Sequence, residues 1–223
     1  MTELTLIIPA KKEKESLPQV IEELKFIDSK KLIVLEESDV ETINAIKEFD
    51  CQIIYQTGKG YGNALIEGMR RTKTKYFCIF NADGSFNPNE LKKMIETIEK
   101  GNKDFIFGSR YEKNAGSDDD TIVTLIGNFI FTFLGNLFFK LNISDILYTY
   151  IVGKTESVNK LNLVSQDFRL CVELPIKAKK NKMELKSIAS YERKRIAGKK
   201  KVNALKDGFM ILTCMIELLF KKS

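Results

Sequence analysis

The sequence contains no histidine, and this absence removes several kinds of chemistry at once. Histidine is the usual general base near neutral pH, the partner of nucleophilic serine or cysteine, and the commonest zinc ligand. Any reaction at this protein must therefore use carboxylates, cations, hydroxyls or a metal ion bound through oxygen.

Cysteine is also scarce, and no two cysteines stand at the spacing of a metal site. We predict four free thiols in a reducing compartment, at Cys51, Cys78, Cys171 and Cys214. No secretory leader is recognisable, because the apolar run Leu4 to Pro9 is short and its lysines follow it instead of preceding it. The sequence thus predicts a cytosolic protein.

Two phosphate-binding motifs are missing as well. The chain has no G-x-x-x-x-G-K-[ST] loop. Its first predicted strand leads into Pro9-Ala10-Lys11-Lys12-Glu13, where a dinucleotide-binding protein would have G-x-G-x-x-G. A dinucleotide-dependent dehydrogenase is therefore disfavoured.

The first half of the chain alternates regularly between apolar runs and amphipathic segments. Strands are predicted at 4–9, 31–35, 51–55, 75–80 and 104–107, and helices at 17–26, 41–49, 61–72 and 89–100. This order predicts an α/β fold with a mostly parallel sheet and helices on both faces. With 223 residues and 43% hydrophobic residues, the chain can form one large domain, or one domain with an appendage.

A buried strand followed by an acidic turn is the most informative part of the sequence. Tyr76 to Phe80 is a continuous apolar run, and Asn81-Ala82-Asp83-Gly84-Ser85 follows it. Asn87 is predicted to cap the next helix, with Pro88 at the first position. Because open α/β sheets bind ligands at the carboxyl ends of their strands, Asp83 is the best single candidate for a functional residue.

Two other turns at the same predicted edge carry charged residues. Glu36 and Glu37 follow the second strand. The third strand leads into the glycine-rich, cationic turn 57–63, whose backbone N–H groups could bind phosphate, although a plain tight connection explains it equally well. Together the three edges suit a nucleotide diphosphate with a bridging divalent cation.

Four motifs in order resemble family 2 glycosyltransferases of the GT-A fold: LTLIIPAKKEKESLPQVIEEL, GKGYGNALIEGMR, YFCIFNADGSFNPNEL and FIFGSRY. They look most like the branch that includes dolichyl-phosphate mannosyltransferase and bacterial polyprenyl-phosphate sugar transferases. The resemblance is close over residues 4 to 111 and looser beyond. It implies a GT-A nucleotide-binding fold, here followed by C-terminal amphipathic helices.

The resemblance implies a metal site at the acidic turn. In the family, a D-x-D turn after the fourth strand holds the divalent cation that bridges the two phosphates of a nucleotide sugar. Here the turn reads Asn81-Ala82-Asp83, so Asp83 is the implied ligand of Mg²⁺ or Mn²⁺. Ser85 and a water could complete the shell.

The resemblance also implies contacts with the nucleotide sugar. Glu13 stands beside the nucleotide, and Glu36 with Glu37 stands where the family reaches the base. Lys59 and Arg110 are the nearest candidates for contacts with the diphosphate. The implied nucleotide-sugar-binding residues are Pro9, Glu13, Glu36, Lys59, Asn81 and Asp83.

Arg110 and Asp145 join Asp83 as candidate catalytic residues. Arg110 lies just past the fifth strand, and a surface ion pair is its alternative role. Asp145 stands where the family has an acid near the sugar or acceptor, and a loop cap is the alternative. The acids 118–120 could bind acceptor or metal, but they equally suit the N-terminus of a helix that begins near Thr121.

The segment from Ile122 to Leu141 is apolar, but polar residues recur in it at three- and four-residue steps. We therefore predict that it lies in a membrane interface or against the core instead of spanning. Farther on, we predict a helix from Ser165 to Lys180 with a kink or break at Pro175, and a strand from Leu185 to Ala189.

The strongest basic cluster spans residues 193–201, and together with the net charge of +6 it requires an anionic partner. The apolar segment Leu205 to Phe220 follows, shorter than the roughly 20 residues of a membrane span. Cations beside an interfacial helix suit a lipid phosphate, although a solvated loop is the ordinary alternative. The candidate phosphate and acceptor contacts are Arg110, Arg193, Arg195, Lys199 and Lys200.

The residues and the resemblance together predict a metal-dependent, membrane-associated glycosyltransferase. Its donor is a UDP- or GDP-linked sugar and its acceptor a polyprenyl phosphate, which needs no strong general base; inversion is implied by the resemblance. A transferase acting on a hydroxyl of a surface glycan is the alternative, and a non-catalytic nucleotide-sugar or polyanion-binding protein is the alternative of another class.

We expect three parts: residues 1–111 as the nucleotide-sugar half, 112–203 as the acceptor half with a mobile loop at 112–120 and the basic segment, and 204–223 as an interfacial helix. The predicted place is cytoplasmic and peripheral, at the inner face of a membrane. Nucleic acid is not an expected partner, because no recognition module is recognisable. The sugar, the base and the oligomeric state stay open.

Overall fold

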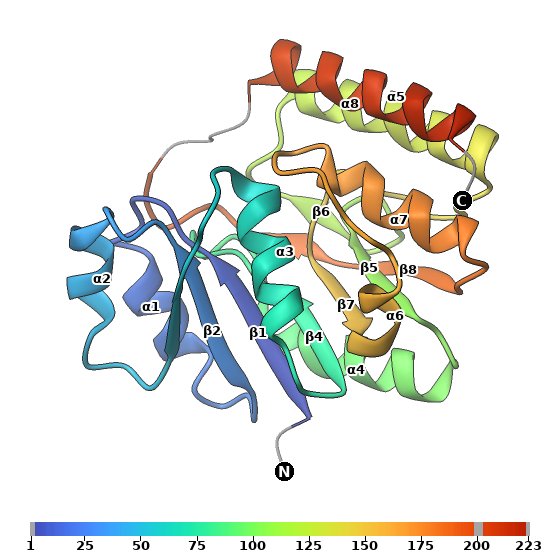
Figure 1. Ribbon diagram of the computed structural model, residues 1–223. Helices are drawn as coiled ribbons and strands as arrows, with labels where there is room; N and C mark the ends of the chain where they lie inside the picture. The colour runs from blue at the N-terminus through green and yellow to red at the C-terminus, as the bar shows by residue number, and fades with distance from the viewer. Residues whose placement is uncertain (1–2, 199–202, 222–223) are drawn as a thin grey trace.

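A seven-stranded sheet lies at the centre of the protein, in the order β3-β2-β1-β4-β7-β5-β8 (Figure 1). The computed structural model describes residues 3–198 and 203–221. The strands are β1 Leu4–Pro9, β2 Lys30–Leu35, β3 Gln52–Tyr55, β4 Tyr76–Ile79, β5 Phe105–Ser109, β7 Ile151–Lys154 and β8 Leu185–Ala189. β7 is antiparallel to both of its neighbours, and the other pairings are parallel, which confirms the predicted mostly parallel sheet.

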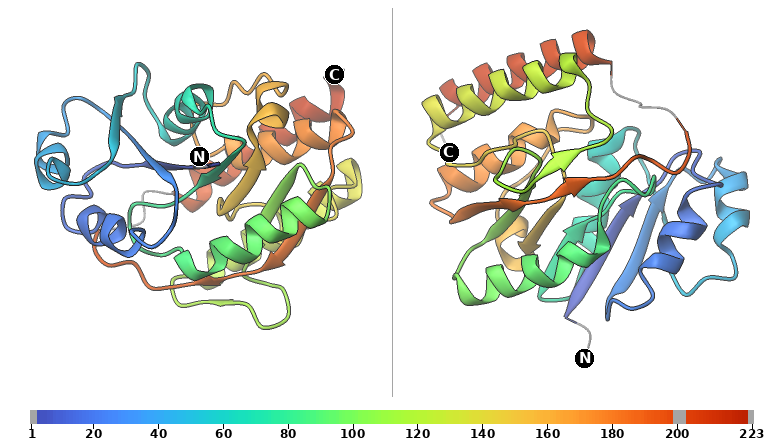
Figure 2. Two further views of the ribbon diagram at one scale, coloured as in Figure 1. Left: turned by 90° about the horizontal axis from the view of Figure 1, so that it is seen from below. Right: turned by 180° about the vertical axis from the view of Figure 1, so that it is seen from behind.

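Helices cover both faces of the sheet, as the sequence predicts (Figure 2). One face is covered by α1 Leu17–Glu23, α2 Val40–Ile46 and α4 Leu91–Lys100, and the other by α3 Tyr61–Arg71, α6 Thr155–Asn159 and α7 Leu170–Lys180. Successive strand residues point to opposite faces, so Leu6 and Ile8 join one apolar cluster and Ile7 joins the other. The core is therefore double, with one half on each side of the sheet.

β7 is the strand of the seven-stranded sheet that the sequence analysis did not predict. It is four residues long and lies between β4 and β5. Its Gly153 fits between two aromatic rings, because a Cβ there would lie 2.6 Å from the ring of Phe77 and 2.7 Å from that of Phe105. A short strand with a central glycine carries little periodic signal, and tertiary packing determines it.

Two predicted helices begin differently from expectation. A 3₁₀ turn, Pro88–Glu90, precedes α4, and the Asn87 side chain accepts a hydrogen bond from the Asn89 N–H, as a cap should. α7 begins at Leu170 and not at Ser165, and it continues through Pro175 without a break. Pro175 is the sixth residue of α7 and lies in its second turn.

The segment expected to be a mobile loop contains a short strand, β6 Gly116–Ser117. It pairs in parallel with β9 Tyr191–Glu192 and forms a second, two-stranded sheet. The Tyr191 hydroxyl donates to Asp118 at 2.7 Å. The loop before α5 is thus held against the segment that follows β8.

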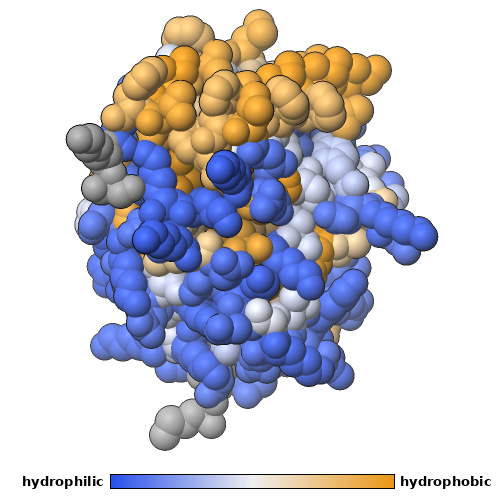
Figure 3. All heavy atoms as spheres, turned by 90° about the vertical axis from the view of Figure 1, so that its right-hand side faces the viewer, coloured by the Kyte–Doolittle hydropathy of each residue, from blue (hydrophilic) through white to orange (hydrophobic). Residues whose placement is uncertain are grey.

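The two longest apolar helices, α5 Ile122–Phe139 and α8 Ala204–Phe220, pack side by side over α7 (Figure 1). Most of the large apolar side chains of α5 face outward, and together with those of α8 they form the apolar cap at the top of Figure 3. By length and composition alone, α5 is long and apolar enough to cross a membrane.

The polar residues of α5 face inward. Asn128 accepts a hydrogen bond from the Leu147 N–H at 3.0 Å, and Thr132 accepts one from the Ile146 N–H at 3.1 Å. Asn136 makes two hydrogen bonds with the backbone of Ile143. These side chains hold the loop 141–147 beneath the helix.

Candidate active site

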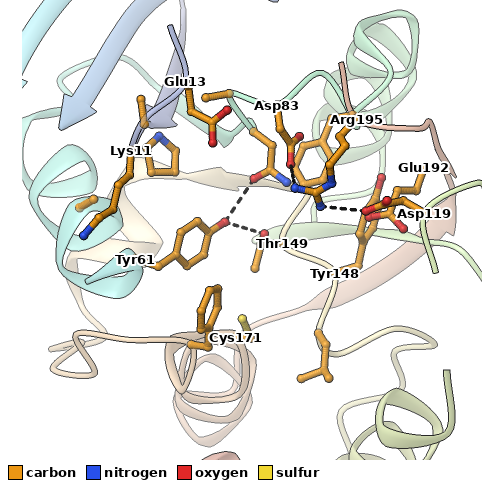
Figure 4. Close-up of a pocket in the computed structure, with 18 of the residues that line it drawn as sticks. Lys11, Glu13, Tyr61, Asp83, Asp119, Tyr148, Thr149, Cys171, Glu192 and Arg195 are labelled. Carbon is orange, nitrogen blue, oxygen red and sulfur yellow. Dashed lines mark hydrogen bonds and ion pairs between the residues drawn. The ribbon is translucent and has the colours of Figure 1, made fainter. Parts of the chain in front are cut away.

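A pocket of about 600 Å³ opens at the carboxyl ends of the parallel strands (Figure 4). Its walls come from the turns after β1 and β4, the ends of β2 and β5, the start of α3, the loop before α5 and the segment after β8. It brings together seven predicted residues: Pro9, Glu13, Glu36, Asn81, Asp83, Arg110 and Arg195. Lys59, Ser85, Asp145 and Arg193 do not line it, and Lys199 and Lys200 lie outside the described residues.

The acidic turn presents Asp83 to the pocket. Gly84 has a φ of +81°, a conformation that a side chain would strain, and it lets the chain reverse directly after the acid. The Ser85 N–H donates to Asp83 Oδ1 at 3.0 Å. Ser85 itself is buried, and its hydroxyl lies 3.5 Å from the amide nitrogen of Asn81.

Residues Arg193–Gly198, which we call the strap, lie across this turn. The Arg193 N–H donates to the Ser85 carbonyl and the Ile196 N–H to the Asp83 carbonyl, both at 2.8 Å. The Ile196 side chain covers Gly84, where a Cβ would come within 2.5 Å of it. Three contacts therefore fix the strap to the acidic turn.

Arg195 extends from the strap into the pocket and lies between two carboxylates (Figure 4). Its guanidinium is 3.4 Å from Asp83 Oδ2 and 2.8 Å from Asp119 Oδ2. Burial works against its charge, but the hydrogen bond with Asp119 and the nearby acids raise the pKa of Arg195. Arg193, predicted as its companion, pairs with Glu23 instead and also donates to the Phe86 carbonyl.

Arg110 lines the pocket and is held in place by acids. Asp145 accepts two hydrogen bonds from the guanidinium, at 2.7 and 3.0 Å, and Glu192 accepts one at 3.1 Å. Burial opposes the charge, yet these acids raise the pKa of Arg110 above its ordinary value. The Asp145 side chain is 0% exposed and also accepts from the Tyr148 N–H, so it reaches the pocket only through Arg110.

The opposite end of the pocket carries the predicted nucleotide contacts. Lys11 pairs with Glu36 at 2.9 Å, and this hydrogen bond lowers the pKa of Glu36. Glu13 is buried and accepts a hydrogen bond from the Ser16 hydroxyl at 2.7 Å. Lys59 is exposed on the turn after β3, so the structure does not bring it to the other candidates.

Sequence reasoning missed the aromatic floor of the pocket. Tyr61 stacks on Phe168 with ring centroids 5.2 Å apart, and its hydroxyl lies 2.7 Å from the Thr149 hydroxyl. Burial raises the pKa of Tyr61 well above its ordinary value, and burial raises the pKa of neighbouring Cys171 to about 12. Tyr61 stands in the glycine-rich turn and could have been suspected, whereas Phe168 lies in an irregular segment without a sequence signal.

The oxygen atoms of Asp83 and Asn81 suit a divalent cation that substrate phosphates also help to bind. Asp83 offers a carboxylate at the pocket wall and Asn81 an amide oxygen, 3.4 Å from the Tyr61 hydroxyl. Over residues 3–198 and 203–221, no three acidic, histidine or cysteine side chains form a metal cluster. This suits Mg²⁺ or Mn²⁺, which commonly binds one or two carboxylates together with substrate phosphates.

The charge of the pocket supports the same conclusion. Six carboxylates and four cationic side chains line it. A diphosphate would add negative charge to a wall that already carries an excess of it, and like charges at short range repel. A divalent cation would remove this conflict.

Comparison with known proteins adds an independent observation. The family model of glycosyl transferase family 2 matches residues 5–161. An uncharacterized protein of Methanocaldococcus jannaschii is 24% identical over 193 residues, which are 83% of this chain and 79% of that protein. The UDP-N-acetylglucosamine–dolichyl-phosphate N-acetylglucosaminyltransferase of Methanococcus voltae is 23% identical over 207 residues, 81% of each chain.

The chain spans only 48% of the length of an uncharacterized Mycobacterium tuberculosis glycosyltransferase that it also matches. Among solved structures, it is similar to glucosyl-3-phosphoglycerate synthase from Mycobacterium tuberculosis in complex with Mn²⁺, UDP and glucosyl-3-phosphoglycerate. The TM-score is 0.77 at 11% identity, and the match covers 98% of this chain and 80% of the other.

Proposed function

The chain belongs to glycosyl transferase family 2, and from this premise we propose that it moves a hexose from a UDP- or GDP-linked sugar to a polyprenyl phosphate at a membrane surface. Its fold is of the GT-A type, as the four sequence motifs predicted. One observation supports the lipid acceptor above the others: a large apolar surface adjoins the pocket. The relative from Methanococcus voltae, named for a dolichyl-phosphate acceptor, agrees with it.

This surface, the apolar platform, consists of the exposed apolar side chains of α5 and α8 (Figure 3). Its members are Ile122, Val123, Leu125, Ile126, Phe129, Ile130, Phe133, Leu137 and Phe138 of α5, and Leu205, Phe209, Leu212, Ile216, Leu219 and Phe220 of α8. A contiguous patch of this size on a water-facing surface marks an interaction site.

A membrane is the partner that best suits the platform. Apolar residues gather on one side of the helix pair, as in helices that lie in the interface plane. Exposed Lys140, Lys206 and Lys221 stand at the helix ends, where they can attract anionic lipid headgroups. We propose a peripheral position, because the inner side of α5 is occupied by its hydrogen bonds to the loop 141–147. The cytoplasmic face remains a prediction from the sequence.

The platform is continuous with the pocket. Thr124 of α5 lines the pocket, as does Leu147, whose N–H is held by Asn128 of α5. An acceptor whose chain lies in the membrane can therefore present its phosphate at the first turns of α5. A water-soluble acceptor has no need of such a surface.

The proposed reaction is a displacement at the anomeric carbon. A phosphate oxygen of the acceptor forms a bond to this carbon, the bond to the donor diphosphate breaks, and its electron pair leaves with the nucleoside diphosphate. A bound Mg²⁺ or Mn²⁺ would neutralise charge on that leaving group. The solved structure of glucosyl-3-phosphoglycerate synthase described above contains Mn²⁺ together with UDP.

We assign the described side chains as follows. Asp83, with Asn81 beside it, holds the cation, and Arg110 and Arg195 supply positive charge. Asp145 acts as a positioning residue, because both of its oxygens bind Arg110 and its side chain is closed to the pocket. Glu13 and Glu36 belong to the nucleotide end. No strong base is required, because the attacking phosphate is already anionic.

A transferase acting on a hydroxyl is the second candidate. It would need a carboxylate base, and Asp119, Asp120 and Glu192 line the pocket. Each of these is already bound, to Arg195, Thr124 and Arg110 respectively. The structure therefore favours an acceptor that brings its own charge.

Release of nucleotide by purified protein tests the proposal. We expect release from a UDP- or GDP-sugar that requires Mg²⁺ or Mn²⁺ and dolichyl phosphate in vesicles. Asp83→Asn should reduce it by about 10²- to 10³-fold. Glu99→Gln, at an exposed acid of α4 that does not line the pocket, is the control. Release with a glycan but not with the lipid phosphate would transfer the assignment to the second candidate.

A further inference from the structure

We propose that Arg195 occupies the cation side of Asp83 while the nucleotide site is empty, so that the protein binds a divalent cation well only together with a diphosphate. This inference rests on the proposed function, because it concerns the same acidic turn. It adds a binding order and a residue that imposes this order.

Both oxygens of the Asp83 carboxylate have partners in the structure. Oδ1 accepts a hydrogen bond from the Ser85 N–H at 3.0 Å, and Oδ2 lies 3.4 Å from the Arg195 guanidinium. A metal ion and a guanidinium cannot share one side of a carboxylate, because both are cations at contact distance. Arg195 must therefore move before Asp83 can coordinate a cation through Oδ2.

Arg195 is held where it is from two directions. The Ile196 N–H donates to the Asp83 carbonyl, which fixes the strap backbone beside the acid. Asp119 binds the far side of the guanidinium at 2.8 Å. The side chains of Arg195, Asp83 and Asp119 are 19%, 14% and 15% exposed, so solvent and salt screen their attraction less than on an open surface.

A diphosphate changes this balance because it offers Arg195 another anionic partner. A guanidinium released from Asp83 can bind phosphate oxygens while its contact with Asp119 keeps it in the pocket. Asp83 is then open to the cation that the diphosphate brings. Since binding free energies are linked, the diphosphate must raise cation affinity by the same factor by which the cation raises diphosphate affinity.

Binding of Mn²⁺ to purified protein, followed by the electron paramagnetic resonance signal of free Mn²⁺, tests the inference without any turnover. The titrations use wild-type protein, Arg195→Gln, Lys11→Gln and Asp83→Asn, each alone and with UDP or GDP. Lys11→Gln also removes one positive charge from the pocket, but at its opposite end, where Lys11 pairs with Glu36. It controls for a general change of pocket charge.

We expect Arg195→Gln to bind Mn²⁺ alone about tenfold more tightly than wild type, and Lys11→Gln to change this affinity by less than about threefold. The gain should disappear when Asp83→Asn is added to Arg195→Gln. The enhancement of Mn²⁺ binding by nucleotide should be smaller in Arg195→Gln than in wild type.

Equal Mn²⁺ affinity in wild type and Arg195→Gln, with nucleotide-dependent binding at Asp83 intact, would overturn this inference alone. So would an equal gain in Lys11→Gln, because charge and not the contact with Asp83 would then be responsible. If no variant binds Mn²⁺ through Asp83 even with UDP or GDP, the metal role in the proposed function fails as well.

Discussion

Two helices on opposite sides of the sheet expose opposite surfaces. α4 buries Leu91, Met94 and Ile98 and turns lysines and glutamates to solvent, as an amphipathic helix of a water-soluble domain does. α5 buries Asn128, Thr132 and Gly135 and exposes isoleucine and phenylalanine. Hydrophobic burial holds α4 in place. In α5 the packing of Phe131, Leu134 and Phe139 against the core is joined by side-chain hydrogen bonds to the backbone of the loop 141–147 and by a close contact at Gly135.

The difference indicates that the outer surface of α5 is not suited to contact with water. Burying its apolar side chains is worth about 25 cal/mol for each Å² removed from water, and the domain itself does not gain this energy. A membrane would supply it. The inner side of α5 meanwhile fixes the loop 141–147, which contains Asp145 and so connects the platform with Arg110.

The largest effect is expected at Asp145, in the loop that α5 holds beneath it. Asp145→Asn leaves Arg110 without its bidentate partner in a buried site. Removing one member of a buried ion pair typically destabilises by about 3–5 kcal/mol. Urea unfolding should show a loss of this order, and a loss below about 1 kcal/mol would show that Glu192 alone satisfies Arg110. Glu37→Gln, at an exposed acid, is the matched control.

The second prediction concerns the outer side of α5. Phe129 and Phe133 are 72% and 55% exposed, so replacing both by serine should leave the unfolding free energy within about 0.5 kcal/mol. Binding to vesicles of phosphatidylcholine and phosphatidylglycerol should weaken by about 3 kcal/mol, roughly a hundredfold. Sedimentation with the vesicles measures it. The α4 control is Lys92→Ser with Glu99→Ser, which keeps the net charge; equal binding by both double variants would remove the platform from the proposal.

The contrast also explains how far the sequence predicts the fold. Period and turn signals located β1 to β5 and α1 to α4 to within a few residues, because each of these elements buries its own apolar side. β7 was missed because its four residues depend on the rings of Phe77 and Phe105. The sequence left open whether α5 lies in a membrane interface or against the core, because periodicity reveals two sides of a helix but not which one faces the core.

The candidate site also has one part that the sequence predicts and another that it does not. Asp83 and Glu36 were predicted to lie close together because strand ends at one sheet edge converge, and the family resemblance added Glu13; all three line the pocket. The place of Asp145 behind Arg110, the stacking of Phe168 on Tyr61 and the contact of Arg195 with Asp83 join segments far apart in the sequence. A single sequence contains no distance between such segments.

A third, smaller effect should appear on the inner side of α5. Thr132→Val removes the oxygen that accepts from the Ile146 N–H and leaves this buried donor unpaired. We expect a loss of about 1–3 kcal/mol in unfolding free energy. Thr97→Val on α4 is the matched control, because the Thr97 hydroxyl only donates to the Lys93 carbonyl of its own helix. If both variants lose the same unfolding free energy, the hydrogen bond between Thr132 and Ile146 makes no special contribution to stability.

The smallest effect concerns Glu90, the residue just before α4. Its carboxylate points inward, whereas the charged side chains of α4 face solvent. It accepts from the Ser190 hydroxyl and the Tyr191 N–H, yet burial raises its pKa above the ordinary value of 4.5. The folded protein therefore holds this proton to higher pH than the unfolded chain does. Glu90 stabilises the fold at low pH, and this stabilisation is lost as pH rises from 4.5 through the raised pKa.

Melting temperatures of wild type and Glu90→Gln, measured from about pH 4 to pH 7, test this sign. Because glutamine does not titrate, the melting temperature of the variant should rise relative to wild type across the window and then stay constant. Glu156→Gln is the opposite control: Lys160 lowers the pKa of Glu156, so wild type should gain relative to that variant as pH rises. A constant difference between wild type and Glu90→Gln would contradict the raised pKa of Glu90, because the hydrogen bonds from Ser190 and Tyr191 would then fully compensate the burial of its carboxylate.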